Sequence, residues 1–173
     1  MVISLKRFIL IGLLISLLFV VSAAEGDLSS SASRLIEQRA VDISGQIKIY
    51  LDAHPDMTLE DLIKDVGFQR IAVQTVGDTG YTYLIVKETG ILEFHPDPDI
   101  RGGSYDNFKE EFPVIWKIID KTVQSQPCTD SSGFYDWRDI EDNIRDKYTY
   151  HHCIEAQSAD GYSFFIGAST YLD

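Results

Sequence analysis

The stretch GYTYLIVKETGILEFHPDP, from Gly80 to Pro98, has the pattern of two strands joined by a tight turn. Its first half, Tyr81–Val86, is rich in aromatic and β-branched residues, which favour a strand. Glu88–Gly90 turns the chain, and Ile91–Phe94 continues as a second apolar strand. His95–Pro98 then ends the pairing, because each proline lacks a backbone N–H. The stretch therefore predicts a β-hairpin that runs into a stiff, polar loop carrying a histidine.

Three further strands are predicted in the C-terminal part of the chain. Ser131–Gly133 opens a short predicted strand over Phe134–Trp137, and an acidic loop from Asp139 to Asp146 follows it. Two longer strands are then expected over Lys147–Ala156 and Tyr162–Tyr171. The segment between them, Ser158-Ala159-Asp160-Gly161, has the composition of a hairpin turn.

Helical periodicity occupies most of the remaining chain. Ser29–Asp52 carries one apolar stripe at three- and four-residue steps and predicts a long helix. Thr58 caps a second helix, which Gly67 interrupts, and Asn107–Val123 predicts a third that Pro113 kinks or restarts. The order of elements indicates an α+β domain with an antiparallel sheet.

The N-terminus has the pattern of an export signal. Lys6-Arg7 precede an uncharged apolar run, Phe8–Val21, and small residues follow at Ser22–Ala24. The run is short for a spanning helix, yet residues 8–24 together approach the required length. Residues 1–24 are thus either a cleaved signal peptide or a retained membrane anchor. In both cases residues 25–173 form the exported domain, secreted or held at the membrane.

Charge and cysteine content narrow the class of partner. The first 24 residues hold two of the 15 basic residues and none of the 27 acidic ones, so the remainder has a net charge of −14. Such a surface disfavours nucleic acid and anionic lipid as partners.

The two cysteines are expected to form a disulfide. Outside the cytoplasm, Cys128 and Cys153 are more often bridged than free, and the alternative is two separate buried thiols.

These segments together resemble a known family, the single-Cache extracytoplasmic sensor domains. GDTGYTYLIVKETGILEFHPDPDIRGGS (Gly77–Ser104) is similar to the family's first hairpin, with its G-Y strand, turn glycine, H-P end and glycine-bearing exit. GFYDWRD, KYTYHHCIEA and YSFFIGASTYLD are similar to its last three strands. With the leading helix, the resemblance spans about residues 29–173 and rests on the ordered set rather than on any one motif.

The resemblance implies a PAS-like fold and a place for a ligand. It implies a five- or six-stranded antiparallel sheet with the long N-terminal helix on one face and helices and loops on the other. A small-molecule pocket is expected on that second face, with the His95–Pro98 loop as a wall that proline holds in place before a ligand arrives.

Candidate ligand-binding residues follow from strand alternation and from charge. Aromatic tips that carry an O–H or N–H orient a small polar ligand, although core packing uses the same residues. A carboxylate also needs a fixed cation in so acidic a domain, and Lys147 matches the lysine of the family's K-x-x-Y pattern. The predicted site comprises Tyr83, His95, Arg101, Trp116, Tyr135, Trp137, Lys147 and Tyr150.

Several other kinds of site find little support in the sequence. Successive strand residues point to opposite faces, so His151-His152-Cys153 cannot converge on one metal ion without a bulge. No Gly-x-Ser-x-Gly, His-Glu-x-x-His or phosphate-loop pattern occurs. We therefore predict no metal, no cofactor and no enzymatic activity.

The predicted function is that of an extracytoplasmic sensor domain for a small organic acid or amino acid. The chain stops at Asp173 without an output module, so it is expected to act alone or through a separate signalling partner. The alternative is a ligand-free interaction module that forms a homodimer through the N-terminal helix. A pilin-like structural subunit is less favoured, because Phe8–Ala24 lacks the glutamate that those proteins carry.

Overall fold

The computed structural model describes residues 31–139 and 141–172. The predicted signal or anchor, residues 1–24, lies outside the described residues. Within them, no helix is both long enough and apolar enough to cross a membrane. The elements are a helix over residues 31–53, α2 (Leu59–Lys64), α3 (Val66–Ala72), β1 (Thr75–Val76), β2 (Gly80–Val86), β3 (Ile91–Phe94), the 3-10 helix η1 (Tyr105–Phe108), α4 (Pro113–Gln124), β4 (Ser131–Arg138), β5 (Ile144–Gln157) and β6 (Ser163–Tyr171).

One antiparallel sheet of six strands contains the predicted hairpin and the three C-terminal strands. Its order is β1-β2-β6-β5-β4, and β3 also pairs with β2. One edge of β2 pairs with β6 from Tyr81 to Val86. The other edge is shared, with β1 at the Gly80 end and β3 at the Val86 end. The PAS-like α+β arrangement that the resemblance implied is thus confirmed, with six strands.

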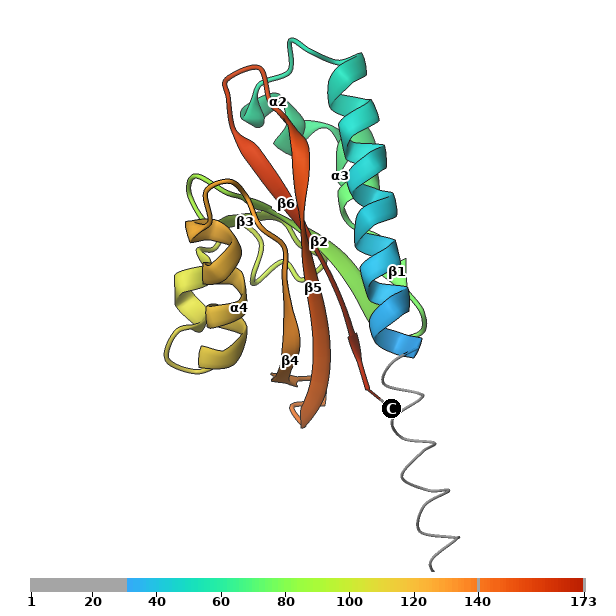
Figure 1. The fold of residues 1–173 in the computed structure, drawn as a ribbon, viewed down its shortest axis with the longest axis vertical. Coiled ribbons are helices and arrows are strands. Elements are labelled where there is room, and N and C mark those ends of the chain that lie inside the picture. Colours follow the sequence, from blue (N-terminus) through green and yellow to red (C-terminus); the bar gives the residue numbers. More distant parts are fainter. Residues whose placement is uncertain (1–30, 140, 173) are drawn as a thin grey trace, which may run out of the picture. The chain divides into compact units, whose positions relative to one another are not determined.

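The two faces of the sheet are covered by different helices (Figure 1). The helix over residues 31–53 lies against one face and buries one stripe of side chains, each at most 4% exposed. That stripe consists of Ile36, Ala40, Ile43, Ile47 and Leu51. On the other face η1 and α4 enclose a second apolar cluster that includes Tyr83, Tyr135 and Phe165. Each face therefore has its own core, as the predicted amphipathic helix requires.

Two helical predictions need correction at their breaks. The break in the second helix falls at Asp65 rather than Gly67, because the Asp65 side chain accepts a hydrogen bond from the backbone N–H of Phe68 and begins α3 there. The third helix is not continuous from Asn107. Pro113 occupies the first turn of α4, so a new helix begins at this proline and no kinked helix runs through it.

β4 and β5 are longer than predicted. They pair from Ser131↔His151 to Arg138↔Ile144, so the last three residues of the expected acidic loop, 144–146, belong to β5. Asp136 and Asp146 are exposed there, which is why an acidic segment is compatible with an edge hairpin. β1 was not predicted, since two residues carry no periodicity.

The predicted disulfide between Cys128 and Cys153 is confirmed, with a Cα–Cα distance of 5.9 Å. It links the segment before β4 to the middle of β5, two parts of the chain that are 25 residues apart. Closing a loop of this length reduces the entropy of the unfolded chain, and the chain-entropy relation gives about 3.5 kcal/mol of stabilisation.

We expect the double variant Cys128→Ser, Cys153→Ser to lower the free energy of unfolding by about 3 kcal/mol, because its unfolded chain regains that entropy. Urea denaturation of the oxidised wild type and of the variant measures the difference. The wild type under reducing conditions is the matched control. Two alkylatable thiols in the folded, oxidised protein would contradict the bridge itself.

Candidate functional site

The sheet face beneath η1 and α4 presents a row of side chains that comes from four strands. Tyr83 of β2 lies opposite Gly167 of β6, Gly167 opposite His151 of β5, and His151 opposite Ser131 of β4. A Cβ atom added at Gly167 would lie only 2.2 Å from the Tyr83 ring, so the ring lies flat on the glycine. Gly167 thus provides the space in which the Tyr83 ring extends toward His151.

Hydrogen bonds connect this row into a buried chain. The Tyr83 hydroxyl is 2.7 Å from His151 Nε2, and His151 Nδ1 is 3.1 Å from Ser131 Oγ. Ser131 Oγ donates its one proton to the carbonyl of Ile118, at 2.7 Å. His151 Nδ1 must therefore carry a hydrogen, which leaves Nε2 to accept the Tyr83 O–H. Burial lowers the pKa of His151 to about 3, so its ring is neutral.

Lys147 is the exceptional residue of this face. It lies opposite Tyr135 and Tyr171 in neighbouring strands and is fully buried. Its Nζ is 3.9 Å from the centre of the Tyr81 ring and 4.8 Å from that of Tyr171. Within the described part of the chain, Nζ has no hydrogen-bond partner. Burial lowers the pKa of this amine to about 7.

His95 closes the site from the end of β3. Its ring packs against Tyr81 and Tyr83, at centroid distances of 5.2 and 5.6 Å. His95 Nδ1 accepts the backbone N–H of Asp97 at 3.0 Å, so the proline-containing loop fixes the ring through its own backbone. Burial lowers the pKa of His95 to about 4, which keeps the imidazole neutral at physiological pH.

These groups surround a cavity of about 20 Å³. Its walls are Tyr81, Tyr83, Leu92, His95, Phe108, Ile115, Ile119, Tyr135 and Trp137. A space of this size holds about one water molecule. The site is therefore a closed aromatic cluster with a buried amine beside it, which we call the aromatic–lysine site.

The structure brings five of the eight predicted residues to this site: Tyr83, His95, Tyr135 and Trp137 line the cavity, and Lys147 adjoins Tyr81.

The other three predicted residues lie elsewhere, each for a physical reason. Tyr150 is three residues from Lys147 and so points to the opposite face, where its hydroxyl donates to Asp130 at 2.7 Å. Trp116 lies outside the cavity lining and donates from Nε1 to Asp106 at 2.9 Å. Arg101 donates to the backbone carbonyl of His95 and lines a different hollow.

Sequence reasoning missed several members of the aromatic–lysine site. Tyr81 shares the face of Tyr83 by alternation, yet only the β2–β6 register brings its ring over Lys147. Thr149 and His151 follow Lys147 at alternate positions, which is the one signal that could have identified them. Ser131 was placed in the opening turn of a strand instead of on its inner face.

Comparison with known proteins gives only distant likenesses. No protein-family profile matches the sequence, and no curated protein matches it. Among solved structures, the PAS-B domain of Drosophila melanogaster Cycle with bound ethylene glycol gives a TM-score of 0.37 at 12% identity, covering 52% of this chain and 97% of that chain. The ligand-binding domain of the Pseudomonas fluorescens chemoreceptor CtaA in complex with L-alanine gives 0.35 at 17% identity, covering 68% of this chain and 39% of that chain. Both likenesses are too distant to say what this chain binds.

We expect Lys147→Met to raise the free energy of unfolding by about 2–4 kcal/mol at pH 7, because the amine loses hydration on folding and gains only contacts with the Tyr81 and Tyr171 rings, without a hydrogen bond among the described residues. The pKa of Lys147 is about 7 in the folded state against 10.5 as the ordinary value. The unfolded chain therefore binds the extra proton in this window, and wild-type stability falls as the pH decreases from about 10 to about 7.

Urea denaturation of both proteins at pH 7 and pH 9.5 tests this expectation. The advantage of Lys147→Met should be largest at pH 7 and should shrink as the pH rises. Equal stability of the two proteins at both pH values would show that the amine already has a partner or is hydrated.

Proposed function

We propose that the domain is an extracytoplasmic sensor module of the single-Cache type that binds a small carboxylate, an organic acid or an amino acid, in the aromatic–lysine site. The observation that carries the proposal is the Lys147 amine, fully buried and without a hydrogen-bond partner among the described residues. A buried cation without a partner is costly, and a ligand carboxylate supplies the missing charge-assisted hydrogen bonds.

The surrounding rings suit the rest of such a ligand. Tyr81 and Tyr83 extend from β2, and Tyr135 extends from β4. Burial raises the pKa of all three hydroxyls, so they stay protonated. The Tyr83 O–H is donated to His151, so Tyr81 and Tyr135 are the donors proposed for the ligand. Apolar ring faces with a few convergent polar tips are typical of small-molecule sites.

Binding requires the site to open, because a cavity of about 20 Å³ has no room for an organic acid. The sheet side of the cavity is held by continuous strand pairing. The opposite side is formed by Phe108 of η1 and by Ile115 and Ile119 of α4, which are separated by the non-helical residues 109–112. We infer that η1 and α4 move outward on binding, and that this movement is the signal passed to a partner.

Two features support the location outside the cytoplasm. Lys6-Arg7 and the following apolar run have the pattern of an export signal. The Cys128–Cys153 disulfide is typical of an oxidising compartment. We include in the proposal that residues 8–24 either are removed or serve as an anchor, and that a separate partner or the domain alone transmits the signal.

A thermal-shift screen of acetate, pyruvate, short dicarboxylates and amino acids tests the function. At least one carboxylate should raise the melting temperature of the wild type, because a ligand of the native state stabilises it by mass action. The matching amide or ester should not. Lys147→Met should lose the shift, whereas Arg39→Ala on the N-terminal helix should keep it. A folded wild type that responds to none of these compounds would reject the proposal.

The protonation state of Lys147 gives a second, independent test. Because the pKa of the free amine is about 7, carboxylate affinity should fall about tenfold per pH unit above pH 7 as the charged form becomes scarce. His95, with a pKa of about 4, and the buried tyrosines, whose pKa values are raised, do not change charge between pH 7 and 9. Calorimetric titration in buffers of different ionisation enthalpy should show proton uptake on binding. An affinity independent of pH would assign the carboxylate to another residue.

The ligand-free interaction module remains the second candidate, and one observation favours it. The N-terminal helix exposes Leu35, Val41 and Ile49 at 54%, 43% and 71%. Leu35 lies outside the buried stripe, which begins at Ile36. Sedimentation equilibrium distinguishes the candidates: this alternative requires a stable dimer that Ile49→Asp disrupts, together with no carboxylate response.

A further inference from the structure

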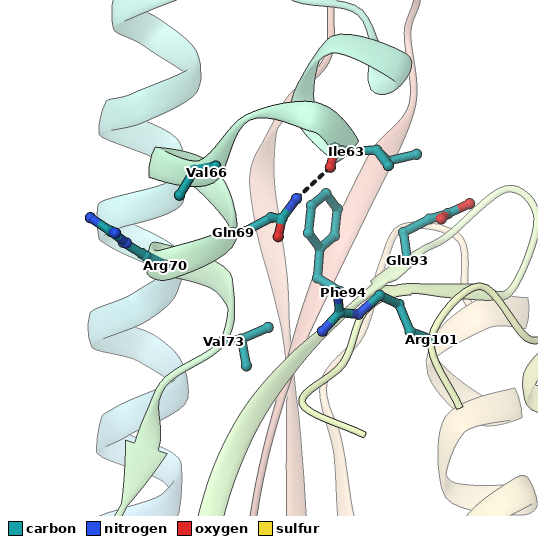
Figure 2. Close-up of a pocket in the computed structure, with 8 residues that line it drawn as sticks. All are labelled: Ile63, Val66, Gln69, Arg70, Val73, Glu93, Phe94 and Arg101. Atoms are coloured by element: carbon teal, nitrogen blue, oxygen red, sulfur yellow. Dashed lines mark hydrogen bonds between the residues drawn. The ribbon is translucent and has the colours of Figure 1, made fainter. Parts of the chain in front are cut away.

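A second, larger hollow lies between α3 and the strand β3, away from the aromatic–lysine site. It has a volume of about 330 Å³, which is within the range of small-molecule sites. Figure 2 shows its lining, which comes from α2, α3, β3 and the loop after β3. The residues are Ile63, Val66, Gln69, Arg70, Val73, Glu93, Phe94 and Arg101.

The end of β3 separates the two sites. Phe94 points toward the face covered by α3, where its ring lies 5.1 Å from that of Phe68. His95, the next residue, points toward the aromatic–lysine site. The hollow therefore shares no lining residue with the aromatic–lysine site. A ligand in the hollow and a ligand in that site would contact different residues.

Arg101 is the cation of the hollow. Its Nε and Nη2 donate to the carbonyl oxygen of His95, at 3.0 and 2.9 Å. These two bonds hold the guanidinium in one orientation, and in Figure 2 the group reaches in beside Phe94. Nη1 makes no hydrogen bond to the described residues, and no described carboxylate forms an ion pair with Arg101. A pre-oriented guanidinium with free N–H groups is a ready partner for a carboxylate.

The remaining wall is largely apolar and accessible. Val66 of α3 is 59% exposed, which is unusual for a large hydrophobic residue. Ile63 and Val73 are partly exposed beside it, and the Phe94 ring closes the inner end. Figure 2 shows Arg70 and Glu93 directed outward at the two rims, so neither fills the space between. The hollow thus combines one inward cation with a mainly apolar wall that also carries the Gln69 amide, whose Nε2 donates to the carbonyl of Ile63.

We propose that this hollow is a second ligand site, and that it binds an amphipathic monocarboxylate, a short- to medium-chain fatty acid, with the headgroup on Arg101 and the chain along Val66 and Val73. One inward cation matches one carboxylate. The Glu93 carboxylate at the rim disfavours a ligand that carries a second negative charge. The chain carries 27 acidic and 15 basic residues. In such an acidic chain, an oriented arginine without a carboxylate partner among the described residues, beside an exposed valine, is consistent with a site for a carboxylate ligand.

The proposal is tested by titrating the folded domain with a series of probes, acetate, butyrate, hexanoate and octanoate, followed by calorimetry and by backbone amide NMR shifts. Affinity should rise with chain length, by about fourfold at most for each added CH₂. Octanol and octylammonium, which lack the carboxylate, should bind at least about tenfold more weakly. The shifted amides should belong to α3, β3 and residues 99–102.

Three variants assign the site. Arg101→Gln should weaken octanoate at least about tenfold, and Val66→Asp, an exposed change that spares the His95 contact, should weaken it similarly by placing a negative charge on the wall. Arg138→Gln is the matched control, because Arg138 is an exposed arginine whose ion pairs with Glu111 and Asp142 lie outside the hollow. Lys147→Met should leave octanoate binding unchanged, so this result does not depend on the function proposed above.

Clear outcomes overturn the proposal. Equal octanoate affinity in the wild type, Arg101→Gln and Val66→Asp would place the ligand elsewhere. If the affinity did not increase from acetate to octanoate, the apolar wall would not contribute to binding, and the proposal of a fatty-acid site would be rejected. Amide shifts confined to β2, β4 and α4 would assign octanoate to the aromatic–lysine site and would remove the case for a second one.

Discussion

The pairing of β2 with β6 is the constraint on which the rest of the structure depends. Six consecutive residue pairs, from Tyr81↔Ser169 to Val86↔Phe164, join the first hairpin to the C-terminal strands. Because alternate residues point to opposite faces, this register decides at once which side chains meet the long helix and which meet α4. A shift by one residue would place Leu84 under α4 and the Tyr83 ring under the N-terminal helix.

The predictable part of the fold was the part with strong local signals. The hairpin, the long helix and the cysteine pair were recoverable because strand alternation, helical spacing and an even cysteine count each leave a mark on the sequence. The break at Asp65 was not, because a single aspartate beside a glycine does not show which of the two ends the helix. The full length of β4 was not either, since its pairing is decided by β5, a separate strand. The rigid loop at His95 could be predicted from the sequence, because Pro96 and Pro98 restrict its backbone whatever the fold.

The site was predictable in composition but not in arrangement. Tyr83, Tyr135, Trp137 and Lys147 meet as expected, whereas Arg101 and Tyr150 do not. No local signal says which face of β5 turns toward α4, so Lys147 and Tyr150 looked equally suitable. Arg101 lies six residues after His95 and seemed to belong to the same wall, yet its guanidinium turns back to the His95 carbonyl from the other side. Contacts to backbone atoms such as this one leave no trace in residue types.

The buried amine of Lys147 also bears on how long the protein persists. A group that costs free energy in the empty fold raises the fraction of molecules that are transiently unfolded, and unfolded chains are the ones that proteases remove. A bound carboxylate offsets that cost and lowers the unfolded fraction. Under the proposed function, the amount of folded domain would then follow the concentration of the carboxylate over hours, through the lifetime of the protein and separately from any rapid change of conformation.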